Sequence, residues 1–271
     1  MLQNLSVSVL IRTRDIESRF RELLKRISRQ TLQPVELVVV DNFSTKAKLE
    51  EMHDLLLQAK TKIFGNKVPL KLVPVSDKEF SHSYTTNVGV FVAAGEFVCV
   101  TNGHSLPSSD AWLERGALHF RNPEIAGVGG YFTSHEDGSA WERLGYDWGW
   151  KKRNELTRAY VKDAFFSTIN CIFRRALWSV YPFDEKLSCE ISETKEFGGE
   201  DYDWALEMQA RGYHIIVEPE FTVHHSHGEK LNQLASKHIV WRQIRRKIKS
   251  FSRPRKAFTR LGKEKPTCIQ I

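Results

Sequence analysis

Short apolar segments alternate with amphipathic segments along the first hundred residues. Continuous apolar runs predict four buried strands, at residues 6–11, 35–40, 69–75 and 96–100. The segments between them, 16–30, 49–59 and 83–94, are predicted to be helices, and the first repeats apolar residues every three or four positions. Apolar strands that alternate with helices are typical of an α/β fold, in which helices cover both faces of a mostly parallel central sheet.

The second half of the chain is less regular. Its pattern predicts helices at 112–121 and 201–211 and strands at 125–132, 169–173 and 213–217. Residues 134–153 predict a long loop, because Trp141, Trp148 and Trp150 lie among glycine and charged residues. Since no internal repeat and no Pro- or Gly-rich linker interrupts the chain, we expect one domain, residues 1–229, followed by a C-terminal tail, residues 230–271.

The tail differs from the rest of the chain in charge. The 271 residues have a formal net charge of +7, but residues 230–271 hold 13 Lys and Arg and one acidic residue, and the first 229 residues have a balance of −5. Within the tail, Trp241, Ile244, Ile248 and Phe251 share one face of a predicted basic helix. Such a helix can lie on an anionic membrane surface or pack its apolar stripe on the folded domain, and nucleic acid is a less favoured partner.

Composition narrows the class of protein and its compartment. Apolar residues make up 41% and charged residues 27% of the chain, which excludes a disordered, collagen-like or disulfide-scaffold protein. No apolar run is long enough to span a membrane, and the N-terminus has no secretory signal pattern. The four cysteines form no Cys-x-x-Cys pair, so we expect reduced thiols and no zinc knuckle. These features favour a cytoplasmic protein, and the basic tail would place it peripherally on the inner face of the membrane.

Polar clusters follow three of the predicted strands. They are residues 12–15, 41–45 and 101–104. Because ligands of parallel α/β sheets bind beyond the carboxyl ends of the strands, we expect these clusters at one binding edge. Asp41 is typical of a turn or a helix N-cap, but its carboxylate can also accept hydrogen bonds from a nucleobase or a ribose. The sequence Asn102-Gly103-His104 is likewise compatible with a turn or with a contact to metal or phosphate.

Two later clusters carry candidate chemistry. His224, His225 and His227 fall within four residues, and alternate residues of a strand face the same way, so His225 and His227 can point together; exposed loop histidines are the alternative. Glu200 and Asp201 follow two glycines at the start of a predicted helix. Acidic residues stabilise a helix start through its dipole, and such a pair can also supply a general base.

Taken in order, these segments resemble the family-2 inverting glycosyltransferases of the GT-A fold. The resemblance rests on VSVLIRTRD, PVELVVVDNFST, FSHSYTTNVGVFVAAGEFVCVTNGHSLP and GGEDYDWALEMQARGY, and it covers residues 5–228. The segment that ends in HSHG resembles the rhamnosyltransferase-like branch. The resemblance implies transfer of a sugar from a nucleotide-diphosphate sugar to a hydroxyl of a glycan or lipid-linked glycan, with inversion, in surface polysaccharide biosynthesis. The catalytic domain is then residues 1–229.

The resemblance also implies roles for individual residues. Asp201 is implied to be the catalytic base, with Glu200 beside it. His104 and His227, or His225, are implied to hold a metal ion. The residues implied to bind the nucleotide are Thr13, Asp15, Asp41, Asn87, Thr101 and Asn102. Trp141, Trp148 and Trp150 can stack on the acceptor sugar, or they pack as ordinary hydrophobic residues.

The chain departs from the family at its metal motif. By its spacing to Pro107, the family's Asp-x-Asp aligns with Asn102-Gly103-His104, so both carboxylates are missing. We therefore expect a divalent cation, Mn²⁺ or Mg²⁺, that is weakly bound or absent, with histidine ligands favouring softer ions over Mg²⁺.

Two other classes remain as alternatives from the sequence. A nucleotidyltransferase also binds a nucleotide on an α/β sheet, but it normally has a glycine-rich loop after the first strand, and Arg12-Thr13-Arg14-Asp15 contains no glycine. A non-catalytic nucleic-acid or membrane adaptor is favoured by the basic tail. Against it, the basic residues gather in the tail rather than along the predicted binding edge.

Overall fold

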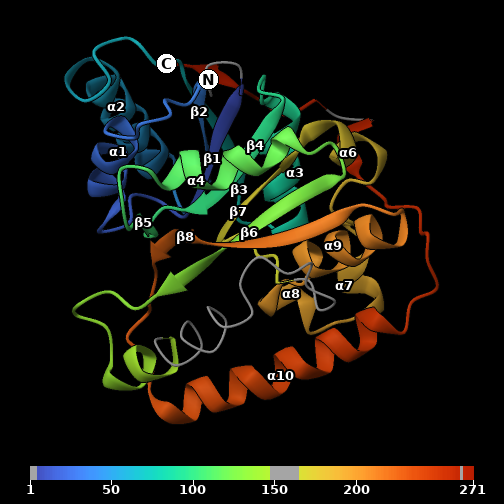
Figure 1. The fold of residues 1–271 in the computed structure, drawn as a ribbon. Coiled ribbons are helices and arrows are strands. Elements are labelled where there is room, and N and C mark those ends of the chain that lie inside the picture. Colours follow the sequence, from blue (N-terminus) through green and yellow to red (C-terminus); the bar gives the residue numbers. More distant parts are fainter. Residues whose placement is uncertain (1–4, 147–164, 263–264) are drawn as a thin grey trace.

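A nine-stranded sheet forms the centre of the molecule. The computed structural model describes residues 5–146, 165–262 and 265–271. The strand order is β5-β8-β6-β7-β4-β1-β2-β3-β9 (Figure 1). The strands are β1 Val7–Thr13, β2 Glu36–Phe43, β3 Leu70–Ser76, β4 Phe97–Asn102, β5 Leu106–Pro107, β6 Ile125–Thr133, β7 Asn170–Arg174, β8 His214–His224 and β9 Ile269–Gln270. Strands β1 to β4, β6 and β8 run in one direction and the other three run against them, so the sheet is mostly parallel, as predicted.

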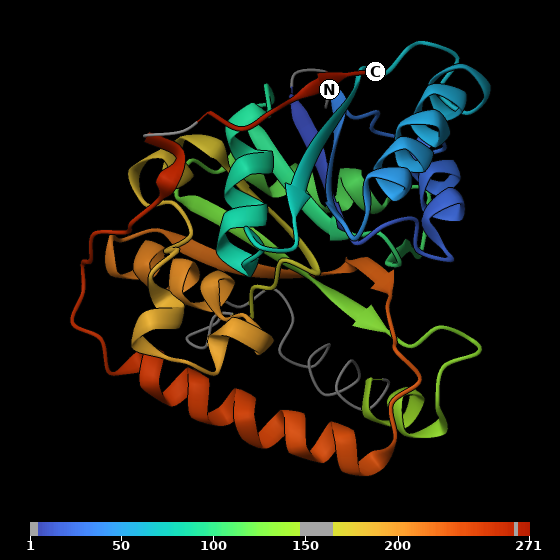
Figure 2. The same ribbon diagram turned by 180° about the vertical axis from the view of Figure 1, so that it is seen from behind.

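Helices cover both faces of this sheet. Helices α1 Phe20–Ser28, α2 Lys46–Lys62 and α4 Trp112–Ala117 pack on one face, where their buried residues join those of β1 and β2 in one apolar core. Helices α3 His82–Val92, α6 Arg175–Val180 and α9 Glu200–Ala210 contribute to a second core on the opposite face, as Figures 1 and 2 show from two sides. Three further helices are α7 Leu187–Glu190, α8 Thr194–Phe197 and α10 Leu231–Lys249. The predicted α/β architecture is confirmed.

The predictions for the second half differ from the structure at three places, two of which concern helices. Residues 140–146 are helical, although a loop was predicted over 134–153. Ser139 and Glu142 form a capping box, in which the Glu142 N–H donates to Ser139 Oγ at 3.1 Å and the Ser139 N–H donates to Glu142 Oε2 at 2.9 Å. The predicted helix 112–121 also divides, because α4 ends at Ala117 and a 3₁₀ turn, Leu118–Arg121, follows it.

Strand β8 extends well beyond its predicted end at Val217. It pairs in parallel with β6 through a register shift near Gly130, and its last residues, Val223 and His224, pair with the short strand β5. This pairing brings the histidine-rich segment after β8 beside His104, which precedes β5.

The apolar stripe of the tail packs on the rest of the folded chain. Ile244 and Ile248 of α10 are fully buried against Leu187, Ile191 and Tyr202. Beyond α10, Arg253 Nη2 lies 2.6 Å from the buried Asp203 Oδ1 of α9, and β9 joins the edge of the sheet beside β3. Of the two interpretations of this stripe, packing on the domain is the one that the structure shows. None of the described helices is both long enough and apolar enough to cross a membrane.

Candidate active site

The polar clusters that follow β1, β2 and β4 meet at one edge of the sheet. The strand register places Thr13 beside Asp41 and Arg12 beside Asn102. Gly103 follows directly, and a Cβ atom at that position would lie 2.4 Å from Thr13 Oγ1. Only glycine therefore lets the turn after β4 approach β1 so closely. The expected binding edge exists.

Asp41 is a buried carboxylate with no side-chain partner among the described residues. Its side chain has no exposed surface, and neither carboxylate oxygen has a hydrogen-bond partner among the described residues. Burial raises the pKa of Asp41 to about 7, and the nearby charges of Asp15 and Glu17 add to the shift. Because an unpartnered buried polar group costs stability, this carboxylate suits a ligand that brings its own donors.

Thr13 and Asp15 shape the loop after β1. The Thr13 hydroxyl lies 3.0 Å from Glu17 Oε1 and 3.0 Å from the Asp15 carbonyl oxygen. Asp15 has a φ of 53°, and its carboxylate accepts hydrogen bonds from the Ser44 N–H and hydroxyl, both at 2.8 Å. These contacts join the β1 loop to the β2 loop above Asp41. On β4, the hydroxyl of the buried Thr101 has no partner in the described part of the chain.

Asn87 does not belong to this edge. Its Oδ1 accepts from Trp178 Nε1 at 2.8 Å and from the Phe183 N–H at 3.1 Å, and its Nδ2 donates to the Phe183 carbonyl at 2.8 Å and to Glu185 Oε1 at 2.9 Å. Both lone pairs and both protons of this fully buried amide are thus used within the protein. The structure corrects the sequence-based assignment: Asn87 holds α3 to the segment after α6 and has no capacity left for a nucleotide.

Three histidines converge at the end of the same edge. One ring nitrogen from each of His104, His225 and His227 lies within 4.8 Å of the others. The rings of His104 and His225 stack with centroids 4.6 Å apart, and His225 Nε2 lies 3.1 Å from His227 Nε2. His104 Nε2 is buried and has no partner among the described residues. The side chains of His225 and His227 point together, although both lie just beyond the end of β8 at His224 and not on the strand.

Neighbouring groups orient two of these rings. His104 Nδ1 hydrogen-bonds to Glu17 Oε2, and His225 Nδ1 lies 2.9 Å from Ser105 Oγ. A carboxylate partner requires a proton on His104 Nδ1, so Nε2 presents its lone pair toward the other rings. Burial lowers the pKa of His225 well below its usual value and also lowers that of His227, so both rings are neutral at neutral pH. Glu17 carried no signal in the sequence because it lies outside the polar clusters, in the segment 16–30 that was predicted to be a helix.

This donor set fits a divalent transition-metal ion. Neutral imidazole nitrogens are good ligands for ions from Mn²⁺ to Zn²⁺, whereas Mg²⁺ prefers oxygen ligands. The partnerless buried nitrogen of His104 and the close approach of His225 and His227 are the features that a bound cation would satisfy.

An acid pair begins α9. Gly198 and Gly199 have φ values of 72° and 125°, which favour glycine and turn the chain into the helix. Asp201 Oδ2 accepts from the Thr168 N–H at 3.0 Å, and the buried Glu200 accepts from the Gly199 N–H at 2.9 Å. Burial raises the pKa of Asp201 to about 6, and the negative charge of Glu200 contributes. Asp201 is therefore a carboxylate whose proton affinity suits a general base near neutral pH.

Arg12 joins the acid pair to the end of β4. Its guanidinium donates to Thr168 Oγ1 at 2.8 Å and to Thr86 Oγ1 at 2.9 Å, and it lies 3.4 Å from Asn102 Oδ1 and 3.6 Å from Glu200 Oε1. The sequence placed Arg12 in a polar cluster but assigned it no role. The available signal was a charged residue just before the end of an otherwise apolar strand.

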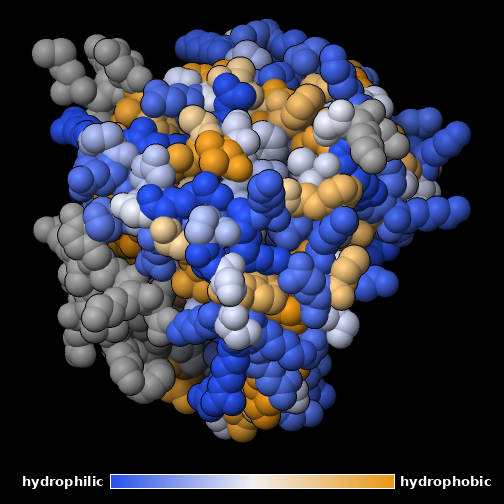
Figure 3. Space-filling model, turned by 90° about the vertical axis from the view of Figure 1, so that its right-hand side faces the viewer, coloured by the Kyte–Doolittle hydropathy of each residue, from blue (hydrophilic) through white to orange (hydrophobic). Residues whose placement is uncertain are grey.

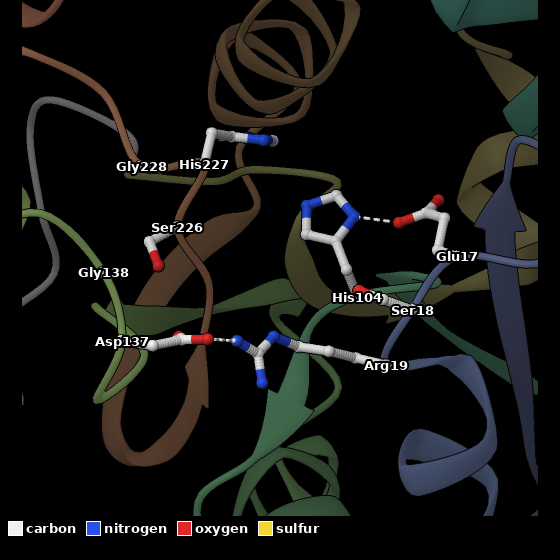
Figure 4. A pocket seen from close by; sticks show the side chains of 9 residues that line it. All are labelled: Glu17, Ser18, Arg19, His104, Asp137, Gly138, Ser226, His227 and Gly228. Carbon is white, nitrogen blue, oxygen red and sulfur yellow. Dashed lines mark hydrogen bonds and ion pairs between the residues drawn. The ribbon is translucent and has the colours of Figure 1, made fainter.

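A pocket of about 500 Å³ opens beside the histidine cluster. Figure 4 shows His104 and His227 on its wall, with Arg19 and Asp137 paired across it. The lining residues are Glu17, Ser18, Arg19, His104, Asp137, Gly138, Ser226, His227 and Gly228. Trp141 is 47% exposed and does not line this pocket, and Trp148 and Trp150 lie outside the described residues.

A family comparison identifies the chain. The model of the family described as "Glycosyltransferase like family 2" matches residues 4–243, which is most of the sequence. The chain belongs to glycosyltransferase-like family 2. The predicted resemblance to this family is confirmed.

The chain is also similar in sequence to individual glycosyltransferases. It is 25% identical over 232 residues to the O-antigen chain rhamnosyltransferase RfbN of Salmonella typhimurium, a match that covers 83% of this chain and 67% of the relative. It is 23% identical over 221 residues to the O-antigen chain rhamnosyltransferase WbaN of Salmonella anatum, covering 78% and 62%. The chain thus spans about two thirds of the length of these relatives.

Solved structures match the fold. The mannosyltransferase PcManGT of Pyrobaculum calidifontis, in complex with GDP-Man and Mn²⁺, superposes with a TM-score of 0.64 at 18% identity, over 92% of this chain and 66% of that one. TarS 1–349 of S. aureus superposes with a TM-score of 0.57 at 17% identity, over 92% and 67%. At these identities the likeness shows the fold, and it confirms the predicted GT-A type arrangement.

Proposed function

We propose that this family member transfers a sugar, with inversion, from a nucleotide-diphosphate sugar to a hydroxyl of a glycan or lipid-linked glycan in surface polysaccharide biosynthesis. The observation that carries the proposal is the placement of Asp201, with its pKa near neutrality, at the sheet edge that also holds the unpartnered Asp41. The rhamnosyltransferase relatives favour a deoxyhexose such as rhamnose as the sugar.

Asp201 is the proposed general base. Its carboxylate takes the proton of the acceptor hydroxyl as that oxygen bonds to the anomeric carbon. The bond from the anomeric carbon to the diphosphate oxygen breaks in the same step, and the nucleoside diphosphate leaves with the electron pair. One displacement inverts the anomeric configuration. Glu200 and Arg12 hold Asp201 and Thr168 in place, which keeps the base aimed at the acceptor.

The nucleotide is proposed to bind at the ends of β1, β2 and β4. Asp41 would accept hydrogen bonds from the base or ribose, which provides the donors that its buried oxygens lack in the protein. Thr13 and Asp15 form the loop above Asp41, and Thr101 and Asn102 line the β4 end.

A divalent cation is proposed at His104, His225 and His227. When bound, it would supply positive charge that stabilises the leaving diphosphate. Glu17 orients His104 toward this position, and Ser105 orients His225. The Mn²⁺ in the structure of PcManGT agrees with divalent cation use in this fold, while the histidine donors favour Mn²⁺ or a later ion over Mg²⁺.

Contact with an anionic membrane is proposed through the outer face of α10. Since Ile244 and Ile248 are buried, the predicted stripe is not available to lipid. Away from this buried face, α10 exposes Leu231 at its start, Ile239 in its middle, and Arg242 and Arg246 further along. Figure 3 shows hydrophilic side chains with hydrophobic patches between them over the lower part of this side of the molecule. A cytoplasmic enzyme held at the inner face of the membrane in this way would meet a lipid-linked acceptor.

Hydrolysis and transfer assays test the proposed reaction. Wild-type protein is incubated with uridine, thymidine and guanosine diphosphate sugars, and release of the nucleoside diphosphate is measured. We expect release with at least one donor and its loss in Asp201→Asn, while Glu50→Gln, an exposed carboxylate on α2, keeps full activity. A nucleotidyltransferase would act on these sugars only with added pyrophosphate, forming a nucleoside triphosphate and a sugar phosphate, and an adaptor would release nothing; either result contradicts the proposal.

A further inference from the structure

Arg19 is the basic residue of the pocket beside the histidine cluster. Of the nine lining residues, it is the one Lys or Arg. Glu17, an acidic residue on the same wall, is already engaged by His104 Nδ1 and by the Thr13 hydroxyl. The other acidic residue, Asp137, pairs with Arg19 across the opening (Figure 4). The charge that an anionic ligand would meet in this pocket therefore depends on the partner of Arg19.

The pair between Arg19 and Asp137 leaves most of the guanidinium unused. A single nitrogen, Arg19 Nη2, lies 2.5 Å and 2.6 Å from the two carboxylate oxygens of Asp137. Nη1 and Nε of Arg19 make no hydrogen bond to the described residues. The Asp137 side chain is 72% exposed, and an ion pair so open to water exchanges partners at little cost.

Arg19 faces the wall where the proposed cation would bind. His104 and His227 line the same pocket, so a diphosphate held against a cation at these rings would lie within the cavity that Arg19 enters. A planar guanidinium with free N–H groups matches two phosphate oxygens at once. The site also lacks the Asp-x-Asp carboxylates, so the histidine cluster adds no negative charge that would repel an anion.

We propose that Arg19 is a diphosphate-binding residue of the donor site, which Asp137 holds when no donor is bound and releases to the phosphates when donor binds. This proposal rests on the proposed glycosyltransferase function. The alternative is a purely structural role, in which the ion pair only holds the loop after β6 against the start of α1.

Nucleoside diphosphate binding separates the two interpretations. Calorimetric titrations use uridine, thymidine and guanosine diphosphate with Mn²⁺, and the tightest of these becomes the probe. We expect Arg19→Ala to weaken binding about 10-fold or more, because a charge-assisted hydrogen bond is lost. We expect Asp137→Asn to tighten binding roughly 2- to 5-fold, because Arg19 is freed from an exposed pair. If the pair only holds the two segments together, both variants should change nucleoside diphosphate affinity in the same direction.

A double variant and a charge-matched control complete the test. In the Arg19→Ala background, Asp137→Asn should no longer change affinity. Glu220→Gln removes one charge from another exposed pair, with Arg115 at 3.2 Å, outside the pocket, and should leave binding unchanged. Changes in one direction for both single variants, or equal tightening by Glu220→Gln, would overturn the role of Arg19 alone. No binding of any nucleoside diphosphate by the wild type would overturn the proposed function together with this role.

Discussion

Arg12 Nη1 lies 3.6 Å from Glu200 Oε1, and this ion pair connects the end of β1 to the start of α9. The arginine is 13% exposed and the glutamate 3%, so the pair is largely shielded from water. Through Thr168, the same guanidinium also borders Asp201. The candidate base is therefore held by a residue from the nucleotide side of the sheet edge.

Replacement of the candidate base should abolish catalysis and spare binding. Asp201→Asn keeps the size of the side chain but cannot accept a proton, so the transfer rate should fall by ~10²- to 10⁴-fold. Nucleoside diphosphate affinity, measured by calorimetry, should stay within a factor of about 2, since a neutral amide fits the same hydrogen bonds. Near-normal turnover in this variant, measured beside Glu50→Gln, would remove Asp201 from the mechanism.

The pH profile of the reaction should report the pKa of Asp201. The base works when deprotonated, so kcat/KM should decline as pH falls below about 6. The positive charge of Arg12 lowers the pKa of Asp201, so Arg12→Gln should move this acidic limb to higher pH. An acidic limb that is the same in wild type and Arg12→Gln would contradict the coupling between the two residues.

Much of this site could be predicted from the amino-acid sequence, and the rest depends on contacts between residues that are distant in the sequence. The strand pattern predicted that residues 12–15, 41–45 and 101–104 meet, because parallel strands place their carboxyl ends at one edge. The sequence also singled out His225 and His227 as a pair that can point together, but the strand from which this was argued ends at His224. Arg12 and Glu17 were missed as functional residues because their partners, Glu200 and His104, are distant in sequence.

Predictions from local sequence were wrong where contacts with distant residues decide the role of a side chain. Asn87 matches a family motif, yet its amide is consumed by Trp178, Phe183 and Glu185, which no local pattern places beside it. The helix at 140–146 did have a signal, the Ser139-x-x-Glu142 capping box, which the surrounding glycine and charged residues obscured.

Removal of the charge of Asp41 should stabilise the protein and impair its binding. The pKa of Asp41 is about 7 in the folded state against an ordinary 3.8, so the folded protein keeps this proton where the unfolded chain has lost it. The stability due to Asp41 is thus complete below about pH 4 and is lost as pH rises toward 7. Asp41→Asn should unfold like the wild type near pH 4 and be more stable by ~2–4 kcal/mol at pH 8.

Urea unfolding of Asp41→Asn and wild type across pH 4 to 8 measures this difference. Glu50→Gln, from an exposed site, should follow the wild-type curve. Nucleoside diphosphate affinity of Asp41→Asn should fall, since the amide replaces one acceptor oxygen by a donor. A stability difference that does not grow with pH would show that Asp41 has found a partner in the folded protein.

Cation binding should depend on a residue that does not itself reach the cation. Glu17→Gln loses the carboxylate that fixes the proton on His104 Nδ1, so Co²⁺ or Mn²⁺ affinity should fall by about 10- to 100-fold. His104→Ala should remove most of the remaining affinity. Co²⁺ absorption and calorimetry give readouts that require no turnover, and Mg²⁺ should bind far more weakly than either ion.

A histidine–glutamate pair elsewhere in the chain is the matched control for this experiment. His119 Nε2 lies 2.6 Å from Glu218 Oε2, outside the cluster, and His119→Gln should leave Co²⁺ affinity unchanged. Equal Co²⁺ affinity in wild type, Glu17→Gln and His104→Ala would reject the histidine site.

The two faces of α10 should separate membrane binding from folding. Arg242→Glu with Arg246→Glu reverses two exposed charges, and each basic residue near an anionic lipid surface contributes about 1 kcal/mol, so binding to phosphatidylcholine vesicles with added phosphatidylglycerol should fall at least ~30-fold. Arg21→Glu with Arg29→Glu makes the same charge change on exposed positions of α1 and its end, and should reduce vesicle binding far less.

Ile244→Ala acts on the buried face of α10 and should cost ~2–5 kcal/mol of stability, while the folded protein floats with vesicles as the wild type does. Flotation that responds equally to both arginine pairs would mean that net charge, and not the outer face of α10, brings the protein to the lipid.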